Sequence, residues 1–373
     1  MPISEATAGG RLTIDLGALK ANYRRFAALA GAAECAAVVK ADAYGIGIGR
    51  AVPALLEAGC RTLFVVQLDE ARAIAPLLPD GVPIYVLNGF YPGSEADFLE
   101  VGAAIPVLNS LAQAQRWRRL AEARGARLPA AVQFDTGMSR LGMPWDEIEA
   151  LAADAGFEHT VDLRLVMSHL ACSEHPDVPA NRHQLALFRA AADKFPGVPR
   201  SLANSGGTVL GPPWAFDLVR VGIALYGGNP TDDPGFTTAP VVQLDAKVIQ
   251  RRTVPAGTGV GYGLTCTTTR TTRVATLGLG YADGWLRSLG GRGAAMFGAM
   301  RLPILGRVSM DSIAIDITDV PEGVLNEGDW VELIGAHQTL DAVAAAAGTI
   351  SYEILTGLGD RYHVRVIDGE HGA

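Results

Sequence analysis

Cysteine and charged residues are both scarce in this chain, and each shortage excludes a class of protein. The 373 residues include four cysteines, Cys35, Cys60, Cys172 and Cys266, and no two of them form a C-x-x-C pair. This spacing argues against a disulfide scaffold and against a structural zinc site. Charged residues make up 19% of the chain and hydrophobic residues 49%, a balance that is not typical of intrinsic disorder.

A basic excess and a long apolar run are also missing. The chain has 31 Lys and Arg against 39 Asp and Glu, a net charge of −8, which argues against general nucleic-acid binding. The uncharged stretches 201–216 and 253–269 are interrupted by Gly, Pro or Thr, so neither predicts a membrane-spanning helix. The first residues, MPISEATAGGR, lack the apolar core of a signal peptide. We therefore expect a soluble, cytoplasmic enzyme with no membrane or nucleic-acid partner.

The first 230 residues repeat one pattern, in which a short apolar run precedes a stretch of helical character. Eight such runs occur, at Ala36–Lys40, Leu63–Gln67, Ile84–Asn88, Ile105–Asn109, Ala131–Asp135, Leu163–His169, Ser201–Asn204 and Leu218–Ile223. Apolar strands that alternate with helices predict a parallel sheet covered on both faces. Eight units predict an α/β fold of the (β/α)8 TIM-barrel type, with a doubly wound open sheet as the alternative.

The character of the sequence changes after the turn-rich segment GNPTDDPGF at residues 228–236. The runs that follow are rich in Val, Thr and Ile, at Val241–Val254, Thr267–Gly280, Leu302–Val320 and Trp330–Gly335. They predict a mostly antiparallel β domain, and residues 340–356 predict one or two helices. We predict a barrel over residues 10–230 and a C-terminal β domain over 236–373, with residues 1–9 as candidates to pack on the latter.

Polar residues lie at the carboxyl ends of the eight apolar runs. In a barrel, the carboxyl ends of the strands form the active-site face. Lys40, His169 and Arg220 stand out, because each would place a charge or an imidazole beside the core. A lysine at the end of a buried strand is costly unless it is paired, neutral or used covalently. An aldehyde cofactor uses such a lysine by forming a Schiff base. Taken alone, Lys40 also fits an ordinary strand end, and His169 a satisfied core histidine.

A series of longer motifs carries a family resemblance along essentially the whole chain. In order, they are VVKADAYG, FDTGMSRLGM, MSHLACSE, LANSGG, RVGIALYG, GVGYG, GYADGW, GRVSMD and ISYEILTGLG. Together they resemble the alanine racemase family, whose members use pyridoxal 5'-phosphate (PLP) to interconvert L- and D-alanine. The resemblance implies a PLP-binding (β/α)8 barrel followed by a β domain.

The resemblance also implies the two catalytic residues. Racemisation requires proton transfer at both faces of the substrate Cα, and one base for each face meets that need. Lys40 would hold PLP covalently and act on one face, and Tyr262 in GVGYG would act on the other. In the family this tyrosine comes from the partner subunit, which implies a homodimer with shared active sites. In isolation, GYG also fits a simple strand bend.

The remaining site residues follow from the same resemblance. PLP would be bound by Tyr44, His169, Asn204, Ser205, Arg220, Gly222, Ile223 and Tyr352, besides Lys40. Loops after strands seven and eight of a barrel often bind phosphate, although the Ser205 segment alone fits a plain turn. Arg220 would face the pyridine nitrogen, with support from His169. Because arginine only donates hydrogen bonds, that nitrogen would stay unprotonated, which weakens the cofactor as an electron sink and should suppress transamination.

Substrate contacts are implied as well. Arg140 and the backbone N–H of Met310 would bind the carboxylate, and Tyr281 and Tyr352 would narrow the entrance. Four charged residues are candidates for an outer gate, or equally for a solvated surface: Glu174, Arg287, Arg307 and Asp311.

One position departs from the family pattern. A lysine that becomes carbamylated usually stands seven residues before the arginine of DTGM-x-R, and here that position is Gln133. A glutamine can accept a hydrogen bond from Arg140 but supplies no charge, and charged pairs form the stronger bonds. We therefore predict either a direct contact between Gln133 and Arg140 or a small anion such as chloride beside them.

These observations predict an alanine racemase that supplies D-alanine for peptidoglycan. A broad-spectrum amino-acid racemase, a PLP-dependent decarboxylase of the same fold and a non-catalytic PLP carrier are the alternatives. Arg220 argues against the decarboxylase, where a carboxylate normally faces the pyridine nitrogen, and the long C-terminal domain argues against the carrier. We expect no metal site, because the six- and eight-residue spacings of His169, His175 and His183 fit no ligand pattern.

Overall fold

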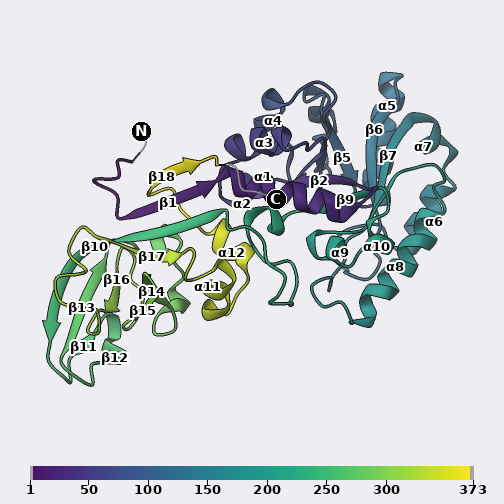
Figure 1. Cartoon of the computed structure of the whole chain (residues 1–373). Coiled ribbons are helices and arrows are strands. Elements are labelled where there is room, and N and C mark those ends of the chain that lie inside the picture. Colours follow the sequence, from purple (N-terminus) through teal and green to yellow (C-terminus); the bar gives the residue numbers. More distant parts are fainter. Residues whose placement is uncertain (1–2, 370–373) are drawn as a thin grey trace. The chain divides into compact units, whose positions relative to one another are not determined.

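The computed structural model describes residues 3–369, and these residues form two compact units (Figure 1). Among the described residues, one unit contains 19–225 and 230–237, and the other contains 3–18, 226–229 and 238–369. An eight-stranded sheet forms the centre of each unit. The division differs from the predicted boundary at residue 10, because strand β1 (Gly10–Asp15) pairs with strands of the second sheet.

The first unit is the predicted barrel, and each of its strands coincides with one of the eight apolar runs. The strands are β2 (Glu34–Val38), β3 (Leu63–Val65), β4 (Ile84–Val86), β5 (Ala104–Leu108), β6 (Leu128–Gln133), β7 (Val161–Met167), β8 (Arg200–Ser201) and β9 (Leu218–Val221). All pairings are parallel, in the order β8-β7-β6-β5-β4-β3-β2-β9. The two ends of this order meet where the Arg220 N–H donates to the Ala203 carbonyl at 2.9 Å. The near-barrel sheet confirms the predicted fold class.

Helices follow nearly every strand. They are α1 (Leu16–Ala30), α2 (Lys40–Tyr44), α3 (Ile48–Glu57), α4 (Leu68–Ile74), α5 (Leu111–Arg124), α6 (Trp145–Ala152), α7 (Ala155–Thr160), α8 (Pro179–Ala192), α9 (Ser205–Val209) and α10 (Pro212–Ala215). Between β4 and β5 the chain forms only the short 3-10 helix η2 (Glu95–Glu100). The segment before η2 contains Gly89, Pro92 and Gly93, and such residues favour turns over helix.

The barrel strands are apolar on both faces because both faces are covered. Every residue of β3, β4 and β5 is buried. The rings of Phe64 and Tyr85 stack inside the barrel unit with centroids 4.9 Å apart. Continuous apolar strands of this kind do not show the alternation of a half-exposed sheet. Polar side chains are therefore accommodated at the ends of the strands.

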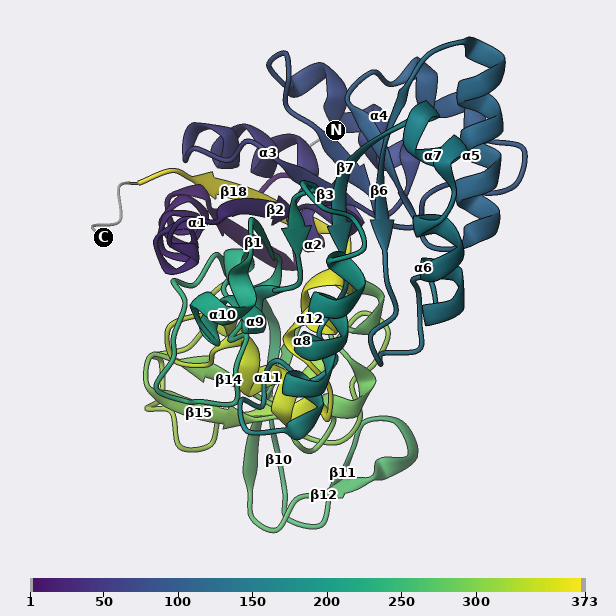
Figure 2. The ribbon, with the colours of Figure 1, turned by 90° about the vertical axis from the view of Figure 1, so that its right-hand side faces the viewer.

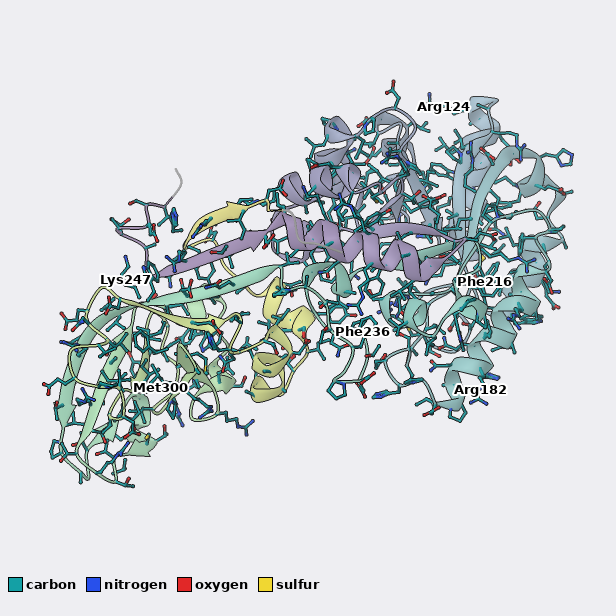
Figure 3. All side chains as sticks on the ribbon, in the orientation of Figure 1. Arg124, Arg182, Phe216, Phe236, Lys247 and Met300 are labelled. Atoms are coloured by element: carbon teal, nitrogen blue, oxygen red, sulfur yellow. The ribbon has the colours of Figure 1, made fainter. Side chains whose placement is uncertain are left out.

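One aromatic residue of the segment 230–237 packs on helix α1 of the barrel unit, and the Asp232 N–H also donates to the Glu174 carbonyl at 3.2 Å. The ring of Phe236, which is labelled in Figure 3, lies edge-on to that of Phe26 in α1, with centroids 6.0 Å apart. The guanidinium of Arg25 lies over the Phe236 ring, 4.5 Å from its centroid. Aromatic and cation–π contacts thus anchor a segment that its turn-rich sequence alone would leave unplaced.

The second unit is the predicted, mostly antiparallel β domain. Its main sheet contains β1, β10 (Val242–Val254), β13 (Thr272–Leu277), β14 (Ala294–Phe297), β15 (Met300–Pro303), β16 (Ile313–Asp316), β17 (Trp330–Ile334) and β18 (Tyr362–Ile367). Only the pairing of β1 with β18 is parallel. The two expected helices are α11 (Leu340–Ala347) and α12 (Ser351–Thr356).

A two-stranded hairpin, β11 (Gly259–Val260) with β12 (Cys266–Thr267), lies at the edge of this unit beside one end of β10 (Figure 2). Tyr262 lies in the tip of that hairpin. No helix within residues 3–369 is long and apolar enough to cross a membrane.

Candidate active site

Lys40 lies directly beyond β2 and begins an unusual turn. The next four residues, Ala41 to Tyr44, are not glycines, yet all have φ between 53° and 56°. This left-handed conformation is unfavourable for L-residues and is found where the surroundings enforce it. The turn is closed by backbone hydrogen bonds from Gly45 N–H to the Ala41 carbonyl and from Gly47 N–H to the Asp42 carbonyl, both 2.9 Å. Lys40 is therefore presented by a strained element at the active-site face.

The amine of Lys40 is half-buried, and its surroundings favour the neutral form. Desolvation lowers the pKa of Lys40, the charge of Arg140 lowers it further, and the carboxylate of Glu70 raises it. A lysine whose pKa is lowered in this way has more of its amine in the nucleophilic, basic form at neutral pH.

Arg220 in β9 is a buried cation without a carboxylate partner. Its side chain donates to the Ser201 hydroxyl at 2.5 Å and to the Ser168 carbonyl at 2.6 Å. Within residues 3–369, no acidic side chain forms an ion pair with Arg220, which is 3% exposed. Burial lowers the pKa of Arg220 to about 9, so the group still carries its charge at neutral pH. A buried cation held by neutral acceptors is well suited to donate a hydrogen bond to a bound ligand.

His169 lies against Arg220, and the contact fixes the imidazole tautomer. The Nδ1 atom is 3.1 Å from an Arg220 nitrogen. A guanidinium can only donate, so Nδ1 accepts and the proton resides on Nε2. Desolvation, followed by the charges of Arg220, Arg140 and Lys40, lowers the pKa of His169 well below its ordinary value. His169 is therefore neutral and is hydrogen-bonded to Arg220.

A second group of the predicted cofactor residues meets at the ends of β8 and β9. The Gly222 N–H donates to the Ser205 hydroxyl at 2.9 Å. Asn204 begins α9 and accepts from the Gly207 N–H at 2.9 Å and from the Ser173 hydroxyl at 2.8 Å. A Cβ at Gly222 would lie 2.3 Å from the Tyr44 hydroxyl oxygen, so only glycine allows this approach. Ile223, which follows, is buried and begins the 3-10 helix η3 (Ile223–Tyr226).

A small pocket brings the substrate-binding candidate together with the departing position. Its lining comprises Gln133, Phe134, Asp135, Met138, Arg140, Leu141, Ser168 and His169. Arg140 and Gln133 both face this pocket, but no hydrogen bond joins their side chains in the described part of the chain. The direct contact that we considered is therefore not formed, and the bound anion stays a prediction.

The other site candidates lie in the second unit and are exposed. Tyr262 is in η4 (Tyr262–Leu264), Tyr281 in η5 (Tyr281–Asp283) and Tyr352 in α12, and Met310 lies in the loop before β16. The exposed fractions are 71% for Tyr262, 52% for Met310, 42% for Tyr281 and 40% for Tyr352, unlike the buried core aromatic residues.

Arg361 joins the turns that carry Tyr281 and Met310. Its guanidinium bonds both oxygens of Asp283, at 2.7 and 2.9 Å, and reaches Asp311 at 2.8 Å. The Asp283 carboxylate also accepts the Gly280 N–H at 2.9 Å. Two backbone bonds complete the link, because the Tyr281 N–H donates to the Ser309 carbonyl at 3.0 Å and the Ala282 N–H to the Met310 carbonyl at 2.9 Å. Asp311, predicted as a candidate for an outer gate, is thus part of this ion-pair cluster.

Sequence reasoning missed Glu70, Ser168, Ser201 and Arg361. The signal for Glu70 was present, because QLDE at residues 67–70 is a capping box that begins α4. Ser201 and Arg361 have no comparable signal, since their partners are distant in the sequence. Within residues 3–369, no three His, Cys, Asp or Glu side chains gather as a metal site would require.

A buried arginine with only neutral hydrogen-bond partners and a half-buried lysine before a left-handed turn both lie at the strand ends of a parallel barrel. This combination defines a barrel enzyme built around a lysine. Comparison with known proteins then gives the family. The alanine racemase N-terminal domain family matches residues 14–230, and the alanine racemase C-terminal domain family matches 241–366. The chain belongs to the alanine racemase family and is an amino-acid racemase.

Individual relatives agree with this assignment. The chain is 52% identical to "Alanine racemase, catabolic" of Agrobacterium fabrum over 95% of this chain and 91% of the relative. It is 49% identical to the protein of the same name in Mesorhizobium japonicum, over 99% and 96%. It also resembles the crystal structure of alanine racemase from Bartonella henselae with covalently bound pyridoxal phosphate, with a TM-score of 0.93, 43% identity and coverage of 96% and 100%.

Proposed function

We propose that this protein binds PLP at Lys40 and interconverts L- and D-alanine with two bases, Lys40 and Tyr262. One observation carries the proposal: a half-buried lysine on a strained turn lies in the same barrel face as a buried arginine that has only neutral partners. The relatives named alanine racemase, one of them with covalently bound pyridoxal phosphate, support it.

The residues present fit the cofactor. The Lys40 amine would hold its aldehyde carbon, and the Arg220 guanidinium would donate to its ring nitrogen. The Ser205 hydroxyl, the Gly222 N–H and the Tyr44 hydroxyl cluster where a phosphate would be received. When bound, PLP withdraws electrons from the substrate Cα and so makes its hydrogen acidic.

The protons at Cα would be moved by side chains of this chain. The Lys40 amine, whose pKa is lowered by burial and by Arg140, would take or return the proton on one face. The Tyr262 hydroxyl would do the same on the opposite face. Tyr262 lies in an exposed hairpin tip of the second unit, so we propose that the partner subunit of a homodimer supplies it. Met310 and Tyr281, held together by the Arg361 cluster, would come from the partner in the same way.

Arg140 would orient the substrate carboxylate, and its own support differs from that of the family. We propose that a small anion such as chloride, beside Gln133 in the pocket that both residues line, replaces the missing carbamate. Replacing chloride by gluconate should then raise the KM for alanine at least about threefold, because the arginine loses a charge-assisted partner. An unchanged KM in chloride-free buffer contradicts the proposed anion.

Two measurements test the proposed function. A visible absorption band, and a pyridoxyl group fixed on Lys40 by borohydride and found by peptide mass spectrometry, would establish the cofactor. A chiral assay with L-alanine should then give D-alanine until the two are equal. Absence of the band, or release of carbon dioxide instead of the enantiomer, contradicts the proposal. Similar turnover of L-alanine, L-serine and L-lysine would indicate a broad-spectrum racemase.

The physiological role is a separate proposal. Enantiomers have equal free energies in water, so the catalyst favours neither direction and the cell's supply decides the flux. We propose that the protein supplies D-alanine for peptidoglycan, and the catabolic names of two close relatives favour alanine breakdown as the second candidate. Deletion of the gene distinguishes them, because a biosynthetic role predicts a requirement for D-alanine and a catabolic role predicts lost growth on alanine.

A further inference from the structure

The turn that presents Lys40 is held in place by a side chain from another element. The Ala41 N–H is the first donor after Lys40, and it points to Oε1 of Glu70 in α4 at 2.6 Å. This bond crosses 29 residues of sequence, from the end of β2 to the helix that follows β3. A left-handed run of non-glycine residues requires such external support, because its own geometry disfavours it.

The other oxygen of Glu70 is committed to its own helix. Oε2 accepts the N–H groups of Val66 and Gln67 at 2.7 and 3.0 Å, completing the capping box at the start of α4. The carboxylate therefore accepts three backbone donors, one from the Lys40 turn and two from the next strand end. Few other groups could replace the Glu70 carboxylate, because the three backbone donors require acceptor sites on two oxygens that lie in one plane.

Glu70 also differs in the sign of its charge from the other ionisable groups that act on Lys40. Arg140 follows β6 and His169 follows β7, and neither supplies a negative charge to the amine. Glu70 is the acidic group that acts on Lys40, and it opposes the effects of burial and Arg140 on the pKa of the amine.

We propose that Glu70 is a positioning residue of the racemase, whose carboxylate fixes the Lys40 turn through the Ala41 N–H and whose negative charge acts on the Lys40 amine. The inference rests on the proposed function for the role of Lys40. It adds a residue that does not touch the substrate, and its two contributions, geometry and charge, can be separated by substitution.

Two variants separate them. Glu70→Gln keeps the shape, but it lacks the charge and presents an NH₂ group to one of the N–H donors. Glu70→Asp keeps the charge and is one methylene too short to reach both donors. Glu147→Gln is the matched control, because Glu147 also accepts a backbone N–H at the start of a barrel helix, from Leu111 at 2.7 Å. The full-length holoenzyme of each is compared by kcat, KM for alanine, and the pH titration of its visible absorption band.

We expect Glu70→Gln to lower kcat at least about tenfold, the effect of one lost charge-assisted hydrogen bond, with a smaller change in KM. The band of this variant should titrate about half a pH unit or more below that of the parent, since a removed negative charge disfavours protonation near Lys40. Glu70→Asp should lower kcat without moving the titration. Glu147→Gln should change neither.

The inference is overturned if Glu70→Gln matches Glu147→Gln in both kcat and titration. If Glu70→Gln fails to fold, Glu70→Asp decides, and a kcat within about twofold of the parent would overturn the inference. Loss of the proposed function is recognised separately, because an unmodified chain that neither binds PLP nor racemises alanine fails before any variant is made.

Discussion

Tyr262 is the residue whose substitution tests the two-base proposal most directly. Tyr262→Phe removes one hydroxyl from an exposed side chain, so it should leave folding and bound PLP unchanged. The loss of a positioned acid or base should lower kcat by about 10²–10⁴-fold. Tyr91→Phe, at a tyrosine that is 65% exposed in the barrel unit, is the control. Activity retained by Tyr262→Phe would remove the phenol from the mechanism.

His169 predicts a pH dependence of stability whose sign follows from its environment. Its pKa in the folded protein is well below the ordinary value of 6.5, mainly because it is desolvated. As the pH falls below 6.5, the unfolded chain therefore binds a proton that the folded protein does not, and stability is lost. His169→Gln should reduce this loss, by at most about 1.4 kcal/mol per pH unit.

Urea unfolding between pH 5 and 7.5 measures the effect, with the exposed His159→Gln as the control for removing a histidine. Equal slopes of stability against pH for the parent and His169→Gln would mean that His169 titrates normally in the folded state.

At the scale of elements, Arg361 reinforces the link that two backbone hydrogen bonds form between the η5 turn and the loop before β16. Arg361→Met removes three hydrogen bonds and leaves Asp283, whose side chain is 7% exposed, without its cation. We expect the free energy of unfolding to fall by about 1–3 kcal/mol, since hydrogen bonds to charged groups are among the stronger ones. The KM for alanine should rise as the Met310 loop loosens.

The control for this prediction is Arg270→Met, which breaks an exposed pair with Asp319. Exposed pairs contribute little, so both stability and KM should stay near the parent values. If the two variants have the same stability and KM, the Arg361 cluster does not position the Met310 loop.

The elements themselves could largely be predicted from the sequence, and the reasons differ from one segment to another. Barrel strands such as Ile84–Val86 are wholly apolar, and this composition predicts burial on both faces. The missing helix between β4 and β5 was not predicted, because the local turn residues there decide against helix. The pairing of β1 with β10 and β18 was not predicted either, since strand partners far apart in sequence leave no local signal.

The site was predictable only in part. Arg220 and Lys40 stand out because a charge beside an apolar run requires an explanation. Ser201 in β8 and Ser168, which follows β7, hold Arg220 but do not stand out, because the role of a buried serine is not visible until its hydroxyl or carbonyl is located in three dimensions. The individual role of each residue came from the family resemblance and not from residue pattern.

At the scale of the whole molecule, the proposed sharing of active sites between two subunits predicts that two inactive variants complement each other. Lys40→Ala and Tyr262→Phe homodimers each lack one base at both sites. A heterodimer of the two has one site with both bases intact. Random exchange makes half of the dimers mixed, so the mixture should recover about one quarter of the parent activity.

Refolding the two variants together and assaying against each alone measures this recovery. A mixture that stays as inactive as its components would mean that both bases of a site belong to one chain, or that the protein acts as a monomer.

The left-handed turn after Lys40 has a consequence for how the chain becomes competent. A newly made polypeptide cannot hold four non-glycine residues in that conformation, and its amine is then an ordinary, charged, solvated lysine. Until the strands on either side have assembled, this amine reacts with cellular aldehydes no more readily than any other lysine. The Lys40 amine thus becomes reactive only late in folding. A damaged or incompletely folded chain therefore does not bind the PLP cofactor.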